Sequence, residues 1–221
     1  MLNKIKGAIF DMDGTLIDSL CVWDMSWEAM GKKFLGVDGF RPSKEDDKAV
    51  RTMLLSDAMD LIHEHYNMGK SGKELLDFVE EFDSNFYRYT VLAKPGVYEF
   101  LDELESRGIK MCLASATDKK LLTIAIEKLG LNKYFSELFS CGDIGKGKEE
   151  PDIFMIAKDH LGTEIAETCV FEDSLLAIKT ANKAGFKTVA IYDKNNYGQE
   201  EMKKIADEYI ADGETLVKLV R

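Results

Sequence analysis

The sequence predicts an α/β fold in which a doubly wound, mostly parallel sheet is interrupted by an all-helical insertion. Short apolar runs typical of strands alternate along the chain with helix-length segments of 3.6-residue periodicity. One interval, residues 11–108, contains no convincing strand, although an ordinary βαβ unit needs only about 30 residues. The 221 residues, 45% of them hydrophobic, are enough to bury a large core.

Each expected strand is a short apolar run, and the helices between them carry residues that commonly start or stop a helix. The pairs of start and stop residues are Pro95-Gly96 with Gly108, Asp118 with Gly130, and Ser174 with Gly185. The expected strands are residues 4–10, 109–114, 138–141, 168–171, 187–191 and, more weakly, 208–211.

The strandless interval has the pattern of a helical domain inserted after the first strand. We expect a core formed by residues 1–18 and 92–221 and a helical cap formed by residues 19–91, which would cover the carboxyl edge of the sheet as a lid. Two apolar stripes at helical spacing predict the insertion's own core. These stripes are Trp23, Trp27, Met30 and Phe34, and then Leu75, Phe78, Val79, Phe82 and Phe86.

Composition excludes several classes of partner. The formal net charge of −11, with no local basic run, disfavours nucleic acid and anionic membranes. The apolar segment near the start is too short for a signal peptide and no segment has the length of a membrane span, so we expect a soluble cytoplasmic protein. The four cysteines lack CxxC spacing and are expected to be reduced, and His63 and His65 are too close in sequence to share a metal on one helix face.

Polar residues follow the strands at the edge where a parallel sheet gathers its carboxyl ends. Asp11 and Asp13 follow the first strand, Ser115 the second, and Glu172-Asp173 the fourth. Carboxylates that meet at low dielectric repel one another unless a cation lies between them. Oxygen ligands of this kind suit Mg²⁺.

The segment "DMDGTLIDSLCV" also begins like an EF-hand loop, but Leu16 and Val22 stand where that loop needs glycine and glutamate. A plain Asp-Gly turn is the simpler alternative, and it leaves the other polar residues unexplained. Ser115 precedes an expected helix, whose amino end favours an anion. Lys146 or Lys148, in a glycine-broken loop after the third strand, can reach the same edge.

Together these segments resemble the four signature motifs of the haloacid dehalogenase-like hydrolase superfamily, in the group of phosphoglycolate phosphatases and β-phosphoglucomutases. The matching residues are Asp11-x-Asp13-Gly-Thr15, Ser115, Lys148 three residues before Pro151-Asp152, and Glu172-Asp173. The resemblance spans nearly the whole chain and favours Lys148 over Lys146.

The resemblance implies a role for each motif residue. Asp11 would be the nucleophile and Asp13 the general acid and base, which favours phosphate chemistry because dehalogenases of the superfamily lack an acid there. Mg²⁺ would be held by Asp11, the main-chain carbonyl of Asp13, and Asp173, with Glu172 orienting its waters. Phosphoryl oxygens would be bound by Lys148, by the Ser115 hydroxyl, and by amides near Met12, Asp13 and Ala116.

The resemblance therefore implies an Mg²⁺-dependent phosphatase acting on a small phosphomonoester such as a sugar phosphate or phosphoglycolate. The alternative is a phosphosugar mutase like the β-phosphoglucomutases, which have a histidine where Trp23 stands here. A receiver-type phosphorylation module fits less well, because its acceptor aspartate follows the third strand. The sequence does not reveal the substrate, the oligomeric state, or the roles of Trp23, Arg51, Lys70 and Lys73.

Overall fold

The computed structural model describes residues 4–51 and 53–220, which form two compact units. Unit 1 comprises Met1–Leu20 and Val91–Arg221, and unit 2 comprises Cys21–Thr90. The sequence analysis expected a helical cap over residues 19–91, and the limits of unit 2 lie two residues and one residue inside that range. No helix in the described ranges combines the length and the apolar character needed to cross a bilayer.

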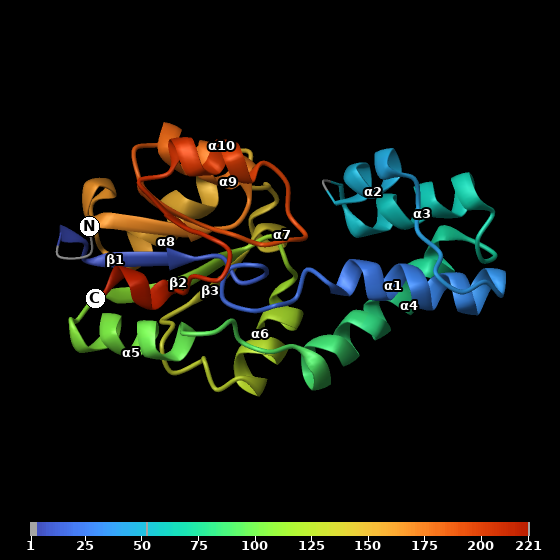
Figure 1. Ribbon diagram of the computed structural model, residues 1–221, viewed down its shortest axis with the longest axis horizontal. Coiled ribbons are helices and arrows are strands. Elements are labelled where there is room, and N and C mark those ends of the chain that lie inside the picture. Colours follow the sequence, from blue (N-terminus) through green and yellow to red (C-terminus); the bar gives the residue numbers. More distant parts are fainter. Residues whose placement is uncertain (1–3, 52, 221) are drawn as a thin grey trace. The chain divides into compact units, whose positions relative to one another are not determined.

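Unit 1 is built on a six-stranded sheet with the order β3-β2-β1-β4-β5-β6, in which every neighbouring pair is parallel (Figure 1). This confirms the predicted α/β class. The strands are β1 (Gly7–Phe10), β2 (Lys110–Ser115), β3 (Leu138–Ser140), β4 (Thr168–Glu172), β5 (Lys187–Ile191) and β6 (Glu208–Ile210). The helices are α5 (Val97–Ser106), α6 (Lys119–Lys128), α7 (Cys141–Ile144), α8 (Asp152–Leu161), α9 (Leu175–Lys183) and α10 (Gln199–Ile205).

Strand β1 is shorter than predicted and begins at Gly7 rather than at residue 4. Ladder pairing on both sides starts at Gly7, which lies opposite Lys110 and Thr168. Residues 4–6 precede the ladder, and the exposed Lys6 ammonium pairs with half-buried Glu167 at 2.7 Å. The apolar run at residues 4–10 therefore predicted the strand β1 but placed its start three residues too early. The ends of helices and strands are often misplaced by a few residues.

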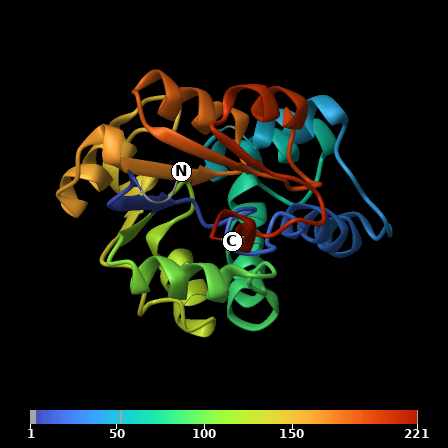
Figure 2. The same ribbon diagram turned by 60° about the vertical axis from the view of Figure 1, so that its left-hand side comes forward.

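Both faces of the sheet are buried, which explains the continuous apolar runs in its strands. On one face, Ile9 and Val170 pack with Phe154 of α8 in the main hydrophobic cluster. On the other face, Phe10 stacks on Phe171 at 4.4 Å between ring centroids, and Phe100 of α5 meets Phe10 edge-on at 6.3 Å. Figure 2 shows the helices on either side of the sheet.

Unit 2 is entirely helical within the residues that are described. Its helices are α1 (Val22–Met30), α2 (Lys44–Val50), α3 (Leu55–Tyr66) and α4 (Gly72–Asn85), with π-helical turns at Gly31–Leu35 and Phe86–Thr90. Most members of the two predicted stripes belong to its core: Trp27 and Met30 of α1 pack with Leu75 and Val79 of α4, whereas Phe82 and Phe86 are not part of this cluster. Trp23 is half-buried against this core, and the Arg51 guanidinium lies 5.3 Å from the centre of its ring.

Candidate active site

The turn after β1 brings the Asp11 and Asp13 motif to the carboxyl edge of the sheet. The Asp11 N–H donates to the Phe171 carbonyl at 2.9 Å, which extends the pairing of β1 with β4 by one residue. The chain then tightens, because the Met12 carbonyl accepts the N–H groups of Leu16 and Ile17 at 2.9 and 3.1 Å. The motif therefore lies directly over the central strands of unit 1.

Gly14 is required in this turn for two reasons. Its φ is +74°, in the left-handed region that side chains rarely adopt. A Cβ atom at this position would lie 2.2 Å from the Asp173 Oδ2 atom. The close approach of the turn to the end of β4 thus depends on the missing side chain.

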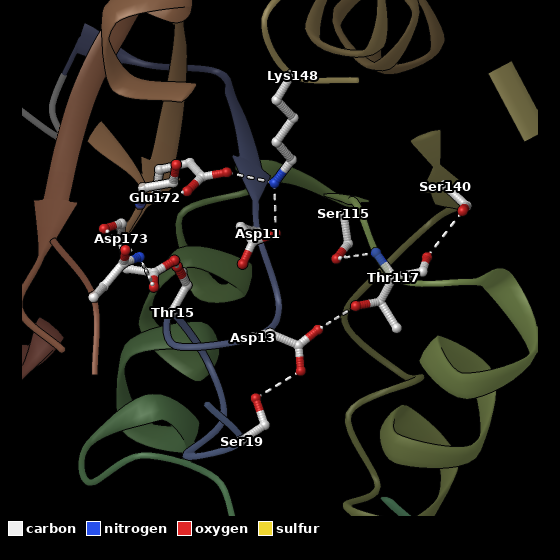
Figure 3. Close-up of polar contacts among 12 residues, drawn as sticks. Asp11, Asp13, Thr15, Ser19, Ser115, Thr117, Ser140, Lys148, Glu172 and Asp173 are labelled. Carbon is white, nitrogen blue, oxygen red and sulfur yellow. Dashed lines mark hydrogen bonds and ion pairs between the residues drawn. The ribbon is translucent and has the colours of Figure 1, made fainter. Parts of the chain in front are cut away.

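Lys148 and three carboxylates meet at the ends of β1 and β4 (Figure 3). The Lys148 Nζ atom donates to Asp11 Oδ1 at 2.5 Å and also to Glu172 Oε1. Carboxylate oxygens of Asp11, Glu172 and Asp173 lie within 4.8 Å of one another. All four side chains are at most 8% exposed. The structure thus brings together four residues that the sequence predicted for one site.

Burial and mutual repulsion govern the charges of this cluster. Burial raises the pKa of Glu172 to about 7, although the Lys148 ammonium acts in the opposite direction. Burial also raises the pKa of Asp173 well above its usual range, and the neighbouring Glu172 and Asp11 carboxylates add to the shift. For Lys148, burial lowers the pKa, but Asp11 and Glu172 more than offset it, so the net pKa is raised.

The donor set of this cluster fits a divalent cation. One ammonium group faces three buried carboxylates, and burying excess negative charge is costly unless a cation compensates it. Mg²⁺ prefers carboxylate and carbonyl oxygens, which are the groups present here. The residues therefore suit the metal that the motif predicts.

Asp173 is fixed by two further side chains. The Thr15 hydroxyl donates to its Oδ1 atom at 3.2 Å. The Asn196 amide donates to its Oδ2 atom at 2.8 Å and to its main-chain carbonyl at 3.0 Å. Asn196 lies in the loop between β5 and α10, a segment in which the sequence analysis found no functional signal.

The Asp13 carboxylate points away from the acidic cluster. Its Oδ1 atom accepts from the Ser19 hydroxyl at 2.6 Å and its Oδ2 atom accepts from the Thr117 hydroxyl at 2.7 Å (Figure 3). Its side chain is therefore separate from the carboxylates of Asp11, Glu172 and Asp173. This arrangement is compatible with the expectation that Asp13 offers a metal its main-chain carbonyl and keeps its carboxylate for acid and base chemistry.

Ser115 ends β2 and is 1% exposed. Its Oγ atom accepts the Thr117 N–H at 3.2 Å, which leaves the hydroxyl hydrogen to be donated elsewhere. Ala116 is exposed in the bend that leads to α6, whereas Met12 is buried in the turn after β1. The main-chain amides of Met12 and Ala116, which are expected to bind phosphate, thus lie on two neighbouring segments at the carboxyl edge of the sheet.

Lys146 and Ser174 lie close to the cluster in sequence but outside its set of side chains. Exposed Lys146 pairs with half-buried Asp152 at 2.6 Å and takes no part in the cluster, which agrees with the resemblance that favoured Lys148. Ser174 was expected to cap the helix that becomes α9, and it occupies the N-cap position, but its side chain makes no capping hydrogen bond. Instead, its N–H donates to Glu172 Oε2 at 2.9 Å, because the buried carboxylate turns back over the start of the helix.

The chain matches the family model of haloacid dehalogenase-like hydrolases over residues 5–185. The chain belongs to the haloacid dehalogenase-like hydrolase family. It is therefore a hydrolase.

Other haloacid dehalogenase-like hydrolases are similar along most of the chain. A phosphorylated carbohydrates phosphatase from Thermotoga maritima is 24% identical over 186 residues, which cover 84% of each protein. The pyrophosphatase PpaX from Oceanobacillus iheyensis is 26% identical over 188 residues, covering 85% of this chain and 84% of that protein. A crystal structure from Thermotoga maritima, assigned as a β-phosphoglucomutase, has a TM-score of 0.81 and 21% identity and covers 98% of each chain. At that identity it shows a shared fold.

Proposed function

We propose that this hydrolase is an Mg²⁺-dependent phosphatase that cleaves small phosphomonoesters, such as sugar phosphates or phosphoglycolate-like acids, through an aspartyl-phosphate on Asp11. The observation that carries the proposal is the contact of Lys148 with Asp11 inside the cluster of three buried carboxylates. A buried lysine beside a carboxylate nucleophile provides the positive charge that an anionic phosphoryl group needs.

In the first step, an Asp11 oxygen forms a bond to phosphorus as the ester P–O bond breaks, and the electron pair of that bond passes to the leaving oxygen. Asp13 gives its proton to that oxygen. In the second step, Asp13 takes a proton from water as the water oxygen bonds to phosphorus, and the Asp11 carboxylate is released. The Ser115 hydroxyl and the Lys148 ammonium hold the phosphoryl oxygens through both steps.

The metal would be held by Asp11, Asp173 and the main-chain carbonyl of Asp13, with Glu172 beside them. When bound, Mg²⁺ neutralises the negative charge of the phosphoryl group. This local positive charge would allow a chain of net charge −11 to bind an anionic substrate.

Hydrolysis rather than phosphosugar transfer is supported by the two relatives named from their sequences, which are a phosphatase and a pyrophosphatase. It is also supported by Trp23, because the mutase group has a histidine at that position. Incubation with β-glucose 1-phosphate and a bisphosphate primer separates the two activities. We expect free phosphate to form faster than glucose 6-phosphate, and the opposite order would indicate a mutase.

The basic test uses p-nitrophenyl phosphate with Mg²⁺ or with a chelator. We expect turnover by the wild-type protein only with the metal, and loss of turnover in Asp11→Asn, which keeps the side-chain shape but removes the nucleophile. Retained activity in Asp11→Asn would exclude Asp11 as the nucleophile. A panel of phosphorylated metabolites then identifies the substrate.

A further inference from the structure

Thr117 connects two residues that the proposed mechanism uses for different tasks. Its main-chain N–H donates to the Ser115 Oγ atom at 3.2 Å, and its hydroxyl donates to the Asp13 Oδ2 atom at 2.7 Å (Figure 3). Its carbonyl accepts from the Ser140 hydroxyl at 2.9 Å. Thr117 is therefore tied to the ends of the three adjacent strands β1, β2 and β3.

These contacts fix the orientation of the Asp13 carboxylate. A carboxylate held at one oxygen can still turn about its Cβ–Cγ bond, whereas hydrogen bonds at both oxygens define its plane. Ser19, which holds the Oδ1 atom, lies six residues along the same turn, but Thr117 is 104 residues away in sequence. Among the contacts described, the Thr117 hydroxyl is the one that links Asp13 to the strand end where Ser115 lies.

A hydroxyl group suits this position because Asp13 must both lose and regain a proton. A hydroxyl donates to a carboxylate and accepts from a carboxylic acid, so the contact survives both states. An amide N–H or an ammonium group can only donate, and it would lose its partner when that oxygen is protonated. The chemistry of threonine therefore matches an acid and base catalyst.

We propose that Thr117 is a positioning residue that holds the Asp13 carboxylate where it reaches the leaving oxygen of a phosphoryl group bound at Ser115. This inference rests on the proposed phosphatase function. Thr117 touches neither phosphorus nor the leaving group. It acts by keeping the Asp13 carboxyl group at a fixed distance from the phosphate site at Ser115. Small errors in such a distance greatly reduce the reaction rate.

The leaving group reveals this role. Phenyl phosphate and p-nitrophenyl phosphate are nearly the same shape, but the more basic phenolate needs a proton from Asp13 and the nitrophenolate does not. In Thr117→Val, we expect kcat/KM to fall about 10-fold or more for phenyl phosphate and less than about 3-fold for p-nitrophenyl phosphate. Thr117→Ser keeps the hydroxyl and should remain within about 3-fold of the wild type for both.

Thr123→Val is the matched control, because the Thr123 hydroxyl donates to the Lys119 carbonyl within α6, a contact outside the site. It should leave both values of kcat/KM unchanged. Thr117→Ala replaces Thr117→Val if valine is not tolerated, and thermal unfolding with and without Mg²⁺ shows that each variant is folded. An equal loss for both substrates, no loss, or failure of Thr117→Ser to retain activity overturns the positioning role. A wild-type protein inactive toward both substrates overturns the phosphatase function itself.

Discussion

The Asn196 amide donates to both the Oδ2 atom and the main-chain carbonyl of Asp173, at 2.8 and 3.0 Å. It thus fixes a carboxylate of the acidic cluster from a separate loop. The loop is itself anchored, since Asp193 pairs with Lys94 at 2.9 Å and its carbonyl accepts the Asn196 N–H at 3.1 Å. Partners of this kind orient a ligand before the metal arrives.

Removing that amide should weaken metal binding. We expect Asn196→Ala to raise the Mg²⁺ concentration needed for half of the metal-induced rise in Tm by about 10–100-fold. Asn195→Ala is the control, because the adjacent Asn195 side chain makes no contact with Asp173 among the hydrogen bonds described, and its amide nitrogen is buried without a partner. Equal midpoints in the two variants would show that Asn196 does not act on the metal site.

The raised pKa values of Glu172 and Asp173 predict how the metal-free protein responds to pH. Each carboxyl binds its proton more tightly in the folded chain than in the unfolded chain, where its pKa is about 4. The stability that this provides is complete below about pH 4 and is lost as pH rises through the folded values, which for Glu172 means about 7. Lys148 stays protonated throughout, because its pKa is raised.

Without divalent metal, we therefore expect Tm to fall between pH 5 and pH 8 by on the order of 5 °C. Mg²⁺ should raise Tm more at pH 8 than at pH 5, since its ligands must be deprotonated. Asp173→Asn should raise the Tm of the metal-free protein at pH 8 and remove the response to Mg²⁺. Differential scanning calorimetry at the two pH values measures both effects. If the Tm of the metal-free protein rose with pH, the site would not hold an excess of buried carboxylates over positive charges.

Lys148 and Lys146 offer a matched comparison of a buried and an exposed lysine. Lys148→Met leaves Asp11 and Glu172 buried without their cation, so we expect a loss of about 3–5 kcal/mol in unfolding free energy without metal. Lys146→Met removes a solvent-exposed ion pair with Asp152, so we expect it to cost far less unfolding free energy than Lys148→Met. Urea unfolding at pH 8 compares them, and turnover of p-nitrophenyl phosphate should be lost only in Lys148→Met. Similar costs for the two variants would argue against a special environment at Lys148.

Gly14 tests the close approach of the first turn to Asp173. Gly14→Ala meets both an unfavourable φ and the Asp173 carboxylate, whereas Gly108→Ala has a φ of +69° and open space around it. The backbone strain alone costs about 1–2 kcal/mol. We expect Gly14→Ala to lose more stability than Gly108→Ala and also to lose its thermal response to Mg²⁺. If Mg²⁺ still raised the Tm of Gly14→Ala, the turn could move away from Asp173 without loss of metal binding.

The sequence predicted the elements whose patterns are local. The strand runs, the stops at Gly108 and Gly130, and the helical stripe around Trp27 each reflect a short-range preference, and each appears in the structure. The grouping of the motif residues could also be predicted, because the carboxyl ends of parallel strands meet at one edge of the sheet. The resemblance to the family motif, in which the lysine stands three residues before Pro151, favoured Lys148 over Lys146.

Residues that act through other residues were not predicted. Thr117 and Asn196 are ordinary loop residues in sequence, and their contacts with Asp13 and Asp173 cross 104 and 23 positions. Only the folded chain brings such pairs together. Ser174 occupies the N-cap position as expected, but its side chain makes no capping hydrogen bond, and the contact of its N–H with Glu172 was not predicted.

The central claim is that Asp11 carries the phosphoryl group during turnover. The direct measurement starts by quenching the protein with acid while it turns over p-nitrophenyl phosphate in the presence of Mg²⁺. The quenched protein is then reduced with borohydride, and its peptides are mapped by mass spectrometry. Borohydride converts an aspartyl-phosphate to homoserine, so we predict homoserine at position 11 and unmodified aspartate at positions 13 and 173. Turnover that leaves Asp11 unmodified, or homoserine at another position, would contradict the account.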